Sequence, residues 1–309
     1  MEFAHRSVLL HECIDALAIK PDGIYLDGTL GGAGHSLEIC RSLTTGRLIG
    51  VDRDLVALEA AKKRLYRHAK KVTLVHDNFE NVGAILTALG LDRIDGMLFD
   101  LGVSSPQLDD AERGFSYMHD APLDMRMSQQ GETAADLVNT ESREELARIL
   151  RDYGEEPYAW QIAGKIVETR ETAPILTTLQ LADIVASAMP PAERRKNKNP
   201  SRRTFQALRI AVNHELDALE EGLDTIFDHL APGGRLCVIT FHSLEDRLVK
   251  NKFRRWSTAC TCPPEFPVCV CGGKAKAKLI TRKPIEADTQ ELEENRRSRS
   301  AHLRVLEKC

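Results

Sequence analysis

The sequence predicts an α/β fold, a doubly wound and mostly parallel sheet with an inserted all-helical domain. Two observations predict it. Short apolar strands alternate with helical segments over about the first 110 residues, and this alternation stops and then resumes after about residue 200. Such alternation builds a parallel sheet that helices cover on both faces. We expect residues 1–109 and 201–309 to form the sheet domain and residues 110–200 the helical domain.

Four short apolar strands are expected in the first part, each followed by polar residues. The strands are expected at 24–26, 48–51, 72–75 and 97–99, with helices at about 35–43, 55–68 and 80–89. The residues that follow the strands are Asp27, Asp52, Asp77 with Asn78, and Asp100. Ligands bind at the carboxyl ends of parallel strands, so acids at this edge predict a binding site.

The middle of the chain has helical patterns and no convincing strand. Ser142 and Glu145 fit a capping box at the start of one helix. A second helix contains Trp160, and a third spans about 178–189. These patterns are the basis for the inserted helical domain.

The sheet pattern then resumes with a long helix and three strands. Apolar residues step by three or four from 216 to 230, and the Pro-Gly-Gly sequence at 232–234 ends that helix. A fifth strand is expected at 236–241. Two late strands, at 278–285 and 302–307, are expected to pair as a hairpin.

The turn after the first strand is the most informative stretch. It contains Gly28, Gly31, Gly32 and Gly34, and the next strand ends at Asp52. Glycines let the backbone approach a ligand closely, and an acid at this position can accept hydrogen bonds from both ribose hydroxyls. The pattern predicts half of a nucleoside-binding unit; a purely structural turn in an unrelated α/β domain is the alternative.

The glycine turn lacks the residues that bind phosphates. A P-loop has Lys after its last glycine, whereas His35 follows Gly34 here, and the dinucleotide pattern Gly-x-Gly-x-x-Gly is also missing. Asp27 would repel a pyrophosphate but suits the ammonium and sulfonium groups of S-adenosylmethionine. We therefore expect S-adenosylmethionine as cofactor. A nicotinamide-dependent dehydrogenase is the competing interpretation, and the missing dinucleotide pattern counts against it.

The segment after the fourth strand is expected to hold the amine that receives a methyl group. The lone pair of an exocyclic amine is delocalised into its ring, and acceptors for both amine protons favour a tetrahedral nitrogen. Ser104, Ser105 and Pro106 offer such acceptors directly after Asp100. We predict catalytic roles for these four residues; an ordinary Ser-Pro turn is the alternative.

Seven segments of the chain resemble one family. They are His5–Glu12, Asp27–Ser36, Asp100–Asp109, Glu112–Tyr117, Pro122–Met127, Arg203–Arg209 and Phe241–Arg247. In these segments the chain is similar to the bacterial 16S rRNA cytosine-N(4) methyltransferases, the MraW family. The resemblance covers essentially the whole chain apart from a cysteine cluster near the C-terminus.

The resemblance implies methyl transfer from S-adenosylmethionine to the exocyclic 4-amino group of a decoding-region cytidine in 16S rRNA. It also implies a sheet of the S-adenosylmethionine-dependent methyltransferase type, with 16S rRNA or the small ribosomal subunit as partner; a homodimer is left open. By position, it implies cofactor contacts at Ala33, Gly34, His35, Asp52, Phe79, Asp100 and Gln107.

Residue chemistry supports two of these contacts. Asp52 suits the ribose, and Phe79 can stack on adenine, unless it is a core phenylalanine. The Ser-Ser-Pro-Gln sequence that ends at Gln107 departs from the pattern of DNA amino-methyltransferases, because the second proline and the aromatic residue are absent. A ring that stacks on the target base would then come from elsewhere, such as Phe115 or Tyr117.

A basic run is the candidate RNA-binding surface. It comprises Arg194, Arg195, Lys196, Lys198, Arg202, Arg203 and Arg209, with no acid between Arg194 and Arg209. Smaller basic clusters lie at 274–283 and 296–299. The formal net charge is −4, so contact with nucleic acid must use local patches. We expect the first run to bind RNA phosphates, with a merely solvated surface as the alternative.

Four of the eight cysteines, namely Cys260, Cys262, Cys269 and Cys271, lie close together in the sequence. Their number matches a structural zinc site, although Cys-x-Cys is tighter than the usual Cys-x-x-Cys. Loop thiols or a redox-labile pair are the alternatives. We recognise no signal peptide and no apolar stretch long enough to span a bilayer, which predicts a cytoplasmic protein with reduced thiols and no membrane partner.

A third functional interpretation is a non-catalytic RNA-binding ribosome assembly factor on a methyltransferase scaffold. Asp27, Gly32, Gly34, Asp52 and Asp100 are all present, which argues against loss of the cofactor site.

Overall fold

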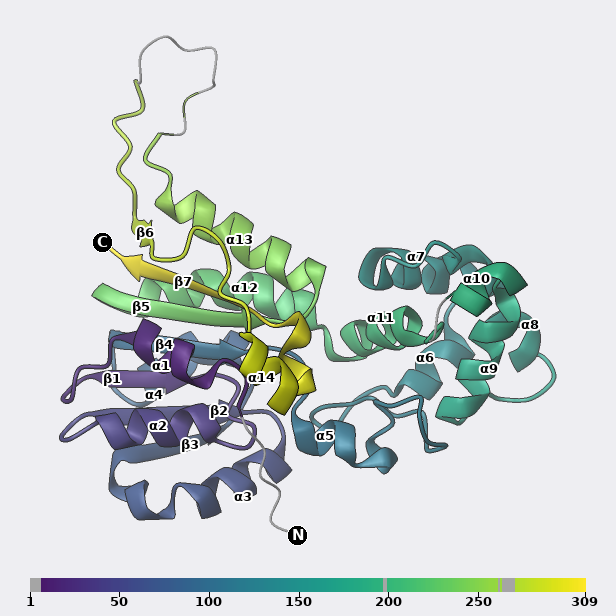
Figure 1. The fold of residues 1–309 in the computed structure, drawn as a ribbon, viewed down its shortest axis with the longest axis horizontal. Coiled ribbons are helices and arrows are strands. Elements are labelled where there is room, and N and C mark those ends of the chain that lie inside the picture. Colours follow the sequence, from purple (N-terminus) through teal and green to yellow (C-terminus); the bar gives the residue numbers. More distant parts are fainter. Residues whose placement is uncertain (1–6, 197–198, 261, 263–269) are drawn as a thin grey trace. The chain divides into compact units, whose positions relative to one another are not determined.

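The computed structural model describes residues 7–196, 199–260, 262 and 270–309 (Figure 1). The chain divides into two compact units, here called the sheet unit (1–102 and 216–309) and the helical unit (103–215). The helical unit is thus longer at both ends than the 110–200 expected. Its additional helix, Arg202–Asn213, packs on other helices of that unit and buries Phe205 and Leu208 in their core.

Within the described residues, one seven-stranded sheet runs through the sheet unit in the order β3-β2-β1-β4-β5-β7-β6. The strands are β1 (Ile24–Asp27), β2 (Arg47–Asp52), β3 (Val72–His76), β4 (Ile94–Asp100), β5 (Leu230–Thr240), β6 (Ala277–Leu279) and β7 (His302–Lys308). The first five pair in parallel, whereas β7 is antiparallel to β5 and β6 is antiparallel to β7. This confirms the predicted mostly parallel sheet.

Helices cover both faces of this sheet. They are α1 (Leu10–Leu17), α2 (Gly34–Ser42), α3 (Leu55–Arg64), α4 (Val82–Ala88), α12 (Glu215–His229), α13 (Ser243–Ser257) and α14 (Thr289–Glu294), with 3-10 helices at Tyr66–Lys71, Phe79–Asn81 and Arg296–Ser300. α1, α2 and α3 pack on one face, with Tyr25 and Leu98; α4, α12 and α13 pack on the other, with Leu26 and Phe99. Successive strand residues therefore enter opposite cores, which explains the near-continuous apolar strands in the sequence.

Two late features differ from expectation. α12 ends at His229, before the Pro-Gly-Gly sequence at 232–234 that was expected to end it. That sequence lies within β5, where the pairing with β4 shifts register between Ile94 and Gly96. Gly233 there has a φ of 76°, which favours glycine. The hairpin of late strands is present, but β6 is short, and Ile285 makes only an isolated bridge to Leu303.

The helical unit has its own hydrophobic core. Its helices are α5 (Ser105–Asp109), α6 (Ala134–Thr140), α7 (Arg143–Gly154), α8 (Ala159–Arg170), α9 (Thr178–Ala188), α10 (Pro191–Lys196) and α11 (Arg202–Asn213), with a 3-10 helix at Ala111–Arg113. Half of the predicted capping box forms on α7: Ser142 Oγ accepts from the Glu145 N–H, while the Glu145 carboxylate bonds Arg148 instead of the Ser142 backbone. Within the described residues, no helix is long and apolar enough to cross a membrane.

The strand order reverses direction at β1. β2 and β3 follow on one side of β1, while β4 and β5 lie on the other. Parallel α/β sheets bind ligands outside the carboxyl ends of their strands at such a reversal. Asp27, Asp52 and Asp100 end β1, β2 and β4, so the fold brings these three acids to that edge.

Candidate active site

Asp27 braces the turn that follows β1. Asp27 is only 2% exposed. Its carboxylate accepts hydrogen bonds from Ser36 Oγ at 2.6 Å and from the Thr29 N–H at 3.3 Å. Burial raises the pKa of Asp27 to about 6, although these two hydrogen bonds oppose the shift. Asp27 thus joins β1 to α2 and contributes negative charge from inside the turn.

The glycines of this turn are required by close packing. A Cβ at Gly28 would lie 2.1 Å from the ring of Phe99, and a Cβ at Gly34 would lie 1.8 Å from Ser7 Oγ. Ala33, the N-cap of α2, has a φ of 55° and is fully buried. Any ligand contact at Ala33 and Gly34 therefore uses the backbone at the start of α2, where N–H groups lack helical partners.

Asp52 ends β2 with its carboxylate held at both oxygens. Oδ2 accepts from the Gly31 N–H at 2.8 Å, and Oδ1 accepts from the Asp54 N–H at 2.9 Å. Burial raises the pKa of Asp52, and the two backbone hydrogen bonds oppose this shift. Each carboxylate oxygen can accept a further hydrogen bond, so the arrangement suits a pair of adjacent hydroxyl groups.

Asp100 ends β4 and has one carboxylate oxygen without a partner. Its backbone N–H donates to Thr29 Oγ1 at 2.6 Å, while its buried Oδ1 makes no hydrogen bond. Its Oδ2 lies 3.9 Å from His35 Nδ1. Burial, followed by the nearby carboxylates of Asp27 and Glu245, raises the pKa of Asp100 to about 8. A buried acceptor with a raised pKa fits a site for a donor or a cation.

His35 is held on its other side. Its Nε2 lies 3.0 Å from the carbonyl oxygen of Val8, which can only accept, so Nε2 carries a proton. Nδ1 therefore faces Asp100. The residue as a whole is 4% exposed. We call the carboxyl edge of the sheet where Asp27, Asp52 and Asp100 lie the acidic edge. The side chain of His35 is buried beside it.

Sequence reasoning missed two residues at this edge. His242 and Glu245 follow β5, where Glu245 is 2% exposed and accepts from the Phe241 N–H at 2.8 Å. Glu245 Oε1 also lies 3.1 Å from His242 Nε2. The signal was available, because both residues follow the fifth strand at the same carboxyl edge as Asp27 and Asp100, within the family-like segment 241–247.

Phe79 lies at this end of the sheet but also packs in the core. Its ring meets the Phe99 ring edge-on with centroids 5.5 Å apart, and a Cβ at Gly222 would lie 3.2 Å from it. The residue is partly buried. Asp77, which follows β3, accepts hydrogen bonds from Asn78 N and from Asn81 Nδ2, each at 2.7 Å. Adenine stacking by Phe79 stays a prediction.

The predicted amine-binding turn belongs to the helical unit. Ser104 is the N-cap of α5, and Gln107 Oε1 accepts from the Ser104 N–H at 2.9 Å. Gln107 is 5% exposed, whereas Pro106 is exposed. The side chain of Ser105 lies outside the described residues. The catalytic roles of this turn and the cofactor contact of Gln107 stay predictions.

The two rings considered for base stacking are used in the core of the helical unit. Phe115 is 8% exposed and packs there, with the Arg113 guanidinium 5.9 Å from its ring. Tyr117 meets Phe205 edge-on at 5.2 Å. Tyr117 is partly buried, and base stacking by either ring stays a prediction.

The structure separates the members of the basic run. Arg194 and Arg195 on α10 and Arg202 and Arg203 on α11 are exposed. Arg209 instead forms a two-bond ion pair with Glu215, at 2.9 and 3.0 Å, so it is not part of the exposed group. Lys198 and the side chain of Lys196 lie outside the described residues.

Three of the four predicted metal ligands, Cys260, Cys262 and Cys271, lie together between α13 and β6. Cys269 lies outside the described residues.

The acidic edge fits the predicted cofactor. Asp52 offers two oriented oxygens for ribose hydroxyls, and Asp100 offers an unpartnered oxygen where a cation or an N–H donor can bind. The closely packed glycine turn brings backbone, rather than side chains, to the same edge. The turn itself contains no Lys or Arg, and the nearby Arg64 of α3 donates from Nη1 to the Gly32 carbonyl oxygen at 2.7 Å.

Comparison with known proteins identifies the family. Residues 2–309 match the family described as the MraW methylase family. The chain belongs to the MraW methylase family. Among its relatives, the ribosomal RNA small subunit methyltransferase H of Lachnospira eligens is 56% identical over 310 residues, which is 100% of this chain and 98% of the relative.

Further relatives agree. A protein with the same name from Paenibacillus sp. is 56% identical over 99% of both chains, and one from Symbiobacterium thermophilum is 55% identical over 100% of this chain and 98% of its own. The MraW family member described here is an S-adenosylmethionine-dependent methyltransferase, consistent with the cofactor chemistry of its acidic edge.

Proposed function

We propose that this methyltransferase modifies the exocyclic 4-amino group of a decoding-region cytidine in 16S rRNA. The observation that carries the proposal is 56% identity, over the whole chain, to a ribosomal RNA small subunit methyltransferase H. The resemblance of seven sequence segments to the cytosine-N(4) enzymes supports the target atom. The substrate is 16S rRNA, free or within the small ribosomal subunit.

Asp52 is proposed to hold the cofactor ribose through its two oriented oxygens. Phe79 is proposed to stack on the adenine ring, and the backbone at Ala33, Gly34 and His35 to line the cofactor. Gln107 is the remaining proposed contact. When bound, S-adenosylmethionine supplies an electrophilic methyl group on a positively charged sulfur.

Asp100 is proposed to contact the reacting amine. Its Oδ1 is buried and makes no hydrogen bond, so it can accept one from the amine without breaking another. Acceptors at Ser104, Ser105 and the backbone around Pro106 would hold the second amine proton. Once the cationic cofactor has favoured the ionised form of Asp100, its carboxylate can take the proton that the nitrogen loses when the methyl group is transferred.

The exposed arginines Arg194, Arg195, Arg202 and Arg203 are proposed to bind RNA phosphates, together with Lys196 and Lys198 of the same run. An overall negative chain needs such a local patch for a polyanionic substrate.

The decisive experiment is a methyl-transfer assay with labelled S-adenosylmethionine on small ribosomal subunits and on protein-free 16S rRNA that lack the modification. Digestion to nucleosides and mass spectrometry should yield N4-methylcytidine, within a single decoding-region fragment. Label in another nucleoside, or at another cytidine atom, would contradict the proposal. RNA binding with no transfer on either substrate would favour the assembly-factor alternative.

A further inference from the structure

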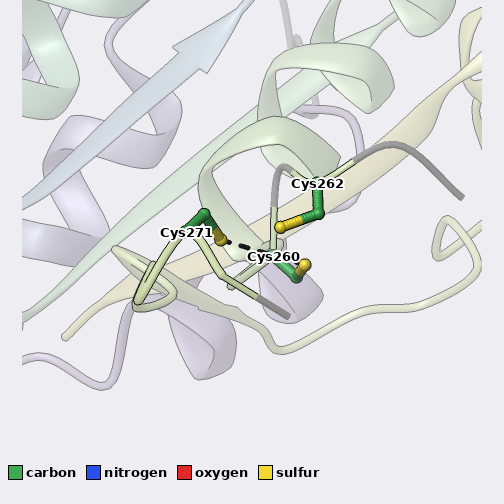
Figure 2. Close-up of side chains that lie close together, drawn as sticks. All are labelled: Cys260, Cys262 and Cys271. Atoms are coloured by element: carbon green, nitrogen blue, oxygen red, sulfur yellow. Dashed lines mark hydrogen bonds between the residues drawn. The ribbon is translucent and has the colours of Figure 1, made fainter. Parts of the chain in front are cut away.

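The segment between α13 and β6 gathers three thiols outside the acidic edge. The Sγ atoms of Cys260, Cys262 and Cys271 all lie within 4.8 Å of one another (Figure 2). Cys271 Sγ and Cys260 Sγ are 3.9 Å apart. The group contains no histidine or carboxylate. Nothing in methyl transfer to an amine uses these residues.

The sulfur spacing discriminates between a disulfide and a metal site. Sulfurs in a disulfide lie about 2 Å apart. Four sulfurs around zinc, each at about 2.3 Å from the ion, lie roughly 3.8 Å from one another at the corners of a tetrahedron. Cys271 Sγ donates a hydrogen bond to Cys260 Sγ at 3.9 Å, a separation that excludes a disulfide between them and is close to a tetrahedron edge. An all-sulfur group selects a borderline-soft ion such as zinc over magnesium or calcium.

We propose that Cys260, Cys262 and Cys271 bind one structural zinc ion. The sequence supplies a candidate fourth ligand in Cys269, two residues before Cys271. If Cys269 supplied the fourth thiolate, the tetrahedral site would have no open position for a substrate or water, as in structural zinc sites.

Backbone N–H groups already point to two of these sulfurs. The Val270 N–H donates to Cys262 Sγ, and the Gly273 N–H donates to Cys271 Sγ, each at 3.4 Å. Such bonds offset negative charge on thiolates and orient them toward a metal. Both contacts hold these sulfurs in place between the two arms of the segment.

The turn after Cys271 is built to keep that geometry. Gly272 has a φ of 58°, and a Cβ at Gly273 would lie 2.1 Å from the carbonyl oxygen of Ala259. The chain thus passes directly beside the residue that precedes Cys260. The Lys276 N–H then donates to the Trp256 carbonyl oxygen at 2.8 Å, which joins the two arms of the segment at its base. Two chain segments that are already held this close lose little conformational entropy when they bind the same metal ion.

Elemental analysis of the full chain, purified without chelator, tests the site. We expect about one zinc per chain in the wild type. The Cys260→Ser and Cys271→Ser variants should each lose at least about tenfold in zinc content. Cys309→Ser is the matched control, because Cys309 is exposed but outside the cluster, and it should keep its zinc. Zinc content near zero in the wild type, or unchanged in both cluster variants, overturns the proposal.

Cobalt substitution tests the ligands directly. Replacing zinc with Co²⁺ should produce thiolate-to-cobalt charge-transfer bands and the intense visible bands of tetrahedral cobalt, and Cys269→Ser should weaken or shift both. An octahedral spectrum, or a Cys269→Ser spectrum identical to wild type, contradicts four-thiolate binding.

Cofactor affinity provides the folding control for these variants. S-adenosylmethionine should bind the cysteine variants as tightly as the wild type, because the acidic edge contains none of these residues. A disulfide among Cys260, Cys262 and Cys271, found by peptide mapping of protein purified without oxygen, would also overturn the zinc proposal. This proposal is independent of the rRNA substrate, so failure of the methyl-transfer assay would leave it unaffected.

Discussion

Asp100 shows how one residue acquires a property that its side chain lacks in water. An aspartate usually ionises near pH 4. Here burial and two neighbouring carboxylates, Asp27 and Glu245, raise its pKa to about 8, and no hydrogen bond to Oδ1 compensates. A cation placed near this carboxylate would reverse the shift, because it favours the ionised form. Binding of a cationic cofactor and loss of the Asp100 proton are therefore linked.

This linkage predicts that S-adenosylmethionine binds more tightly as pH rises. Below about pH 8 the free enzyme holds Asp100 protonated, so binding a cation must first displace that proton; above its pKa the carboxylate is already ionised. Calorimetry from pH 6.5 to 9 should show affinity rising and then levelling off. Asp100→Asn should flatten the profile, while Asp92→Asn, at a 99% exposed carboxylate, should not. A wild-type affinity that is constant or falls over this range contradicts the linkage.

Asp52 makes a different contribution, because its two oxygens are oriented by backbone N–H groups. Asp52→Ala should weaken S-adenosylmethionine binding by about 2–4 kcal/mol, since two hydroxyls lose a charged acceptor. Calorimetry measures this loss, and circular dichroism checks that the turn has kept its fold. Asp92→Asn again serves as the control. Equal affinities of the wild type and a folded Asp52→Ala variant would exclude Asp52 from the ribose site.

At the scale of elements, Ser105 at the start of α5 is predicted to contribute to turnover more than to cofactor binding. Ser105→Ala should lower the rate of methyl transfer more than it lowers cofactor affinity, because its proposed bond forms to the reacting nitrogen. Single-turnover kinetics with saturating cofactor measures this effect. Ser116→Ala, in the loop that follows in the same unit, is the control. A full single-turnover rate in Ser105→Ala would remove Ser105 from the mechanism.

Helices α10 and α11 carry the exposed arginines of the helical unit. Changing Arg202 and Arg203 together to Glu should weaken rRNA binding and lower the slope of log affinity against log salt by about two units, because each lost phosphate contact releases fewer counterions. Filter binding over a salt series measures this slope. Cofactor affinity should stay the same.

A charge-matched variant controls that experiment. Changing Lys62 and Lys63 on α3 to Glu alters the net charge equally on the sheet unit. It should affect the salt slope much less. Equal slopes of log affinity against log salt in the two double variants would mean that the change reflects the net charge of the protein and not phosphate contacts by Arg202 and Arg203.

The whole molecule consists of two units with separate hydrophobic cores, and each contains one of the two tryptophans. Trp256 is 6% exposed and stacks on Phe227 in the sheet unit, whereas Trp160 is 49% exposed on α8 of the helical unit. A cofactor that binds the acidic edge stabilises the sheet unit by mass action. In the Trp160→Phe variant Trp256 is the remaining tryptophan, so its fluorescence reports the unfolding of the sheet unit, to which the cofactor is expected to bind.

In Trp160→Phe, S-adenosylmethionine at about 100 times its Kd should stabilise the transition seen by Trp256 fluorescence by about 2.7 kcal/mol. Urea unfolding with and without cofactor measures this change. The same experiment in a variant that also carries Asp52→Ala should show a much smaller shift at the same cofactor concentration. No shift in Trp160→Phe would place the cofactor outside the sheet unit.

The sequence by itself determined the alternation of strands and helices, the acids that end β1, β2 and β4, and the glycine turn. These features depend on local periodicity and on residues adjacent in the chain, which a linear sequence displays directly. The same is true of the Ser142 cap on α7, which spans only three residues.

Tertiary structure alone decided which distant residues meet. Glu245 raises the pKa of Asp100 from far along the chain, Arg209 is taken up by Glu215, and α11 joins the core of the helical unit rather than the sheet domain. Cys260 and Cys271 likewise lie 3.9 Å apart where Gly273 passes directly beside Ala259. Burial and charge interactions depend on distances in space, and spacing along the chain does not specify these distances.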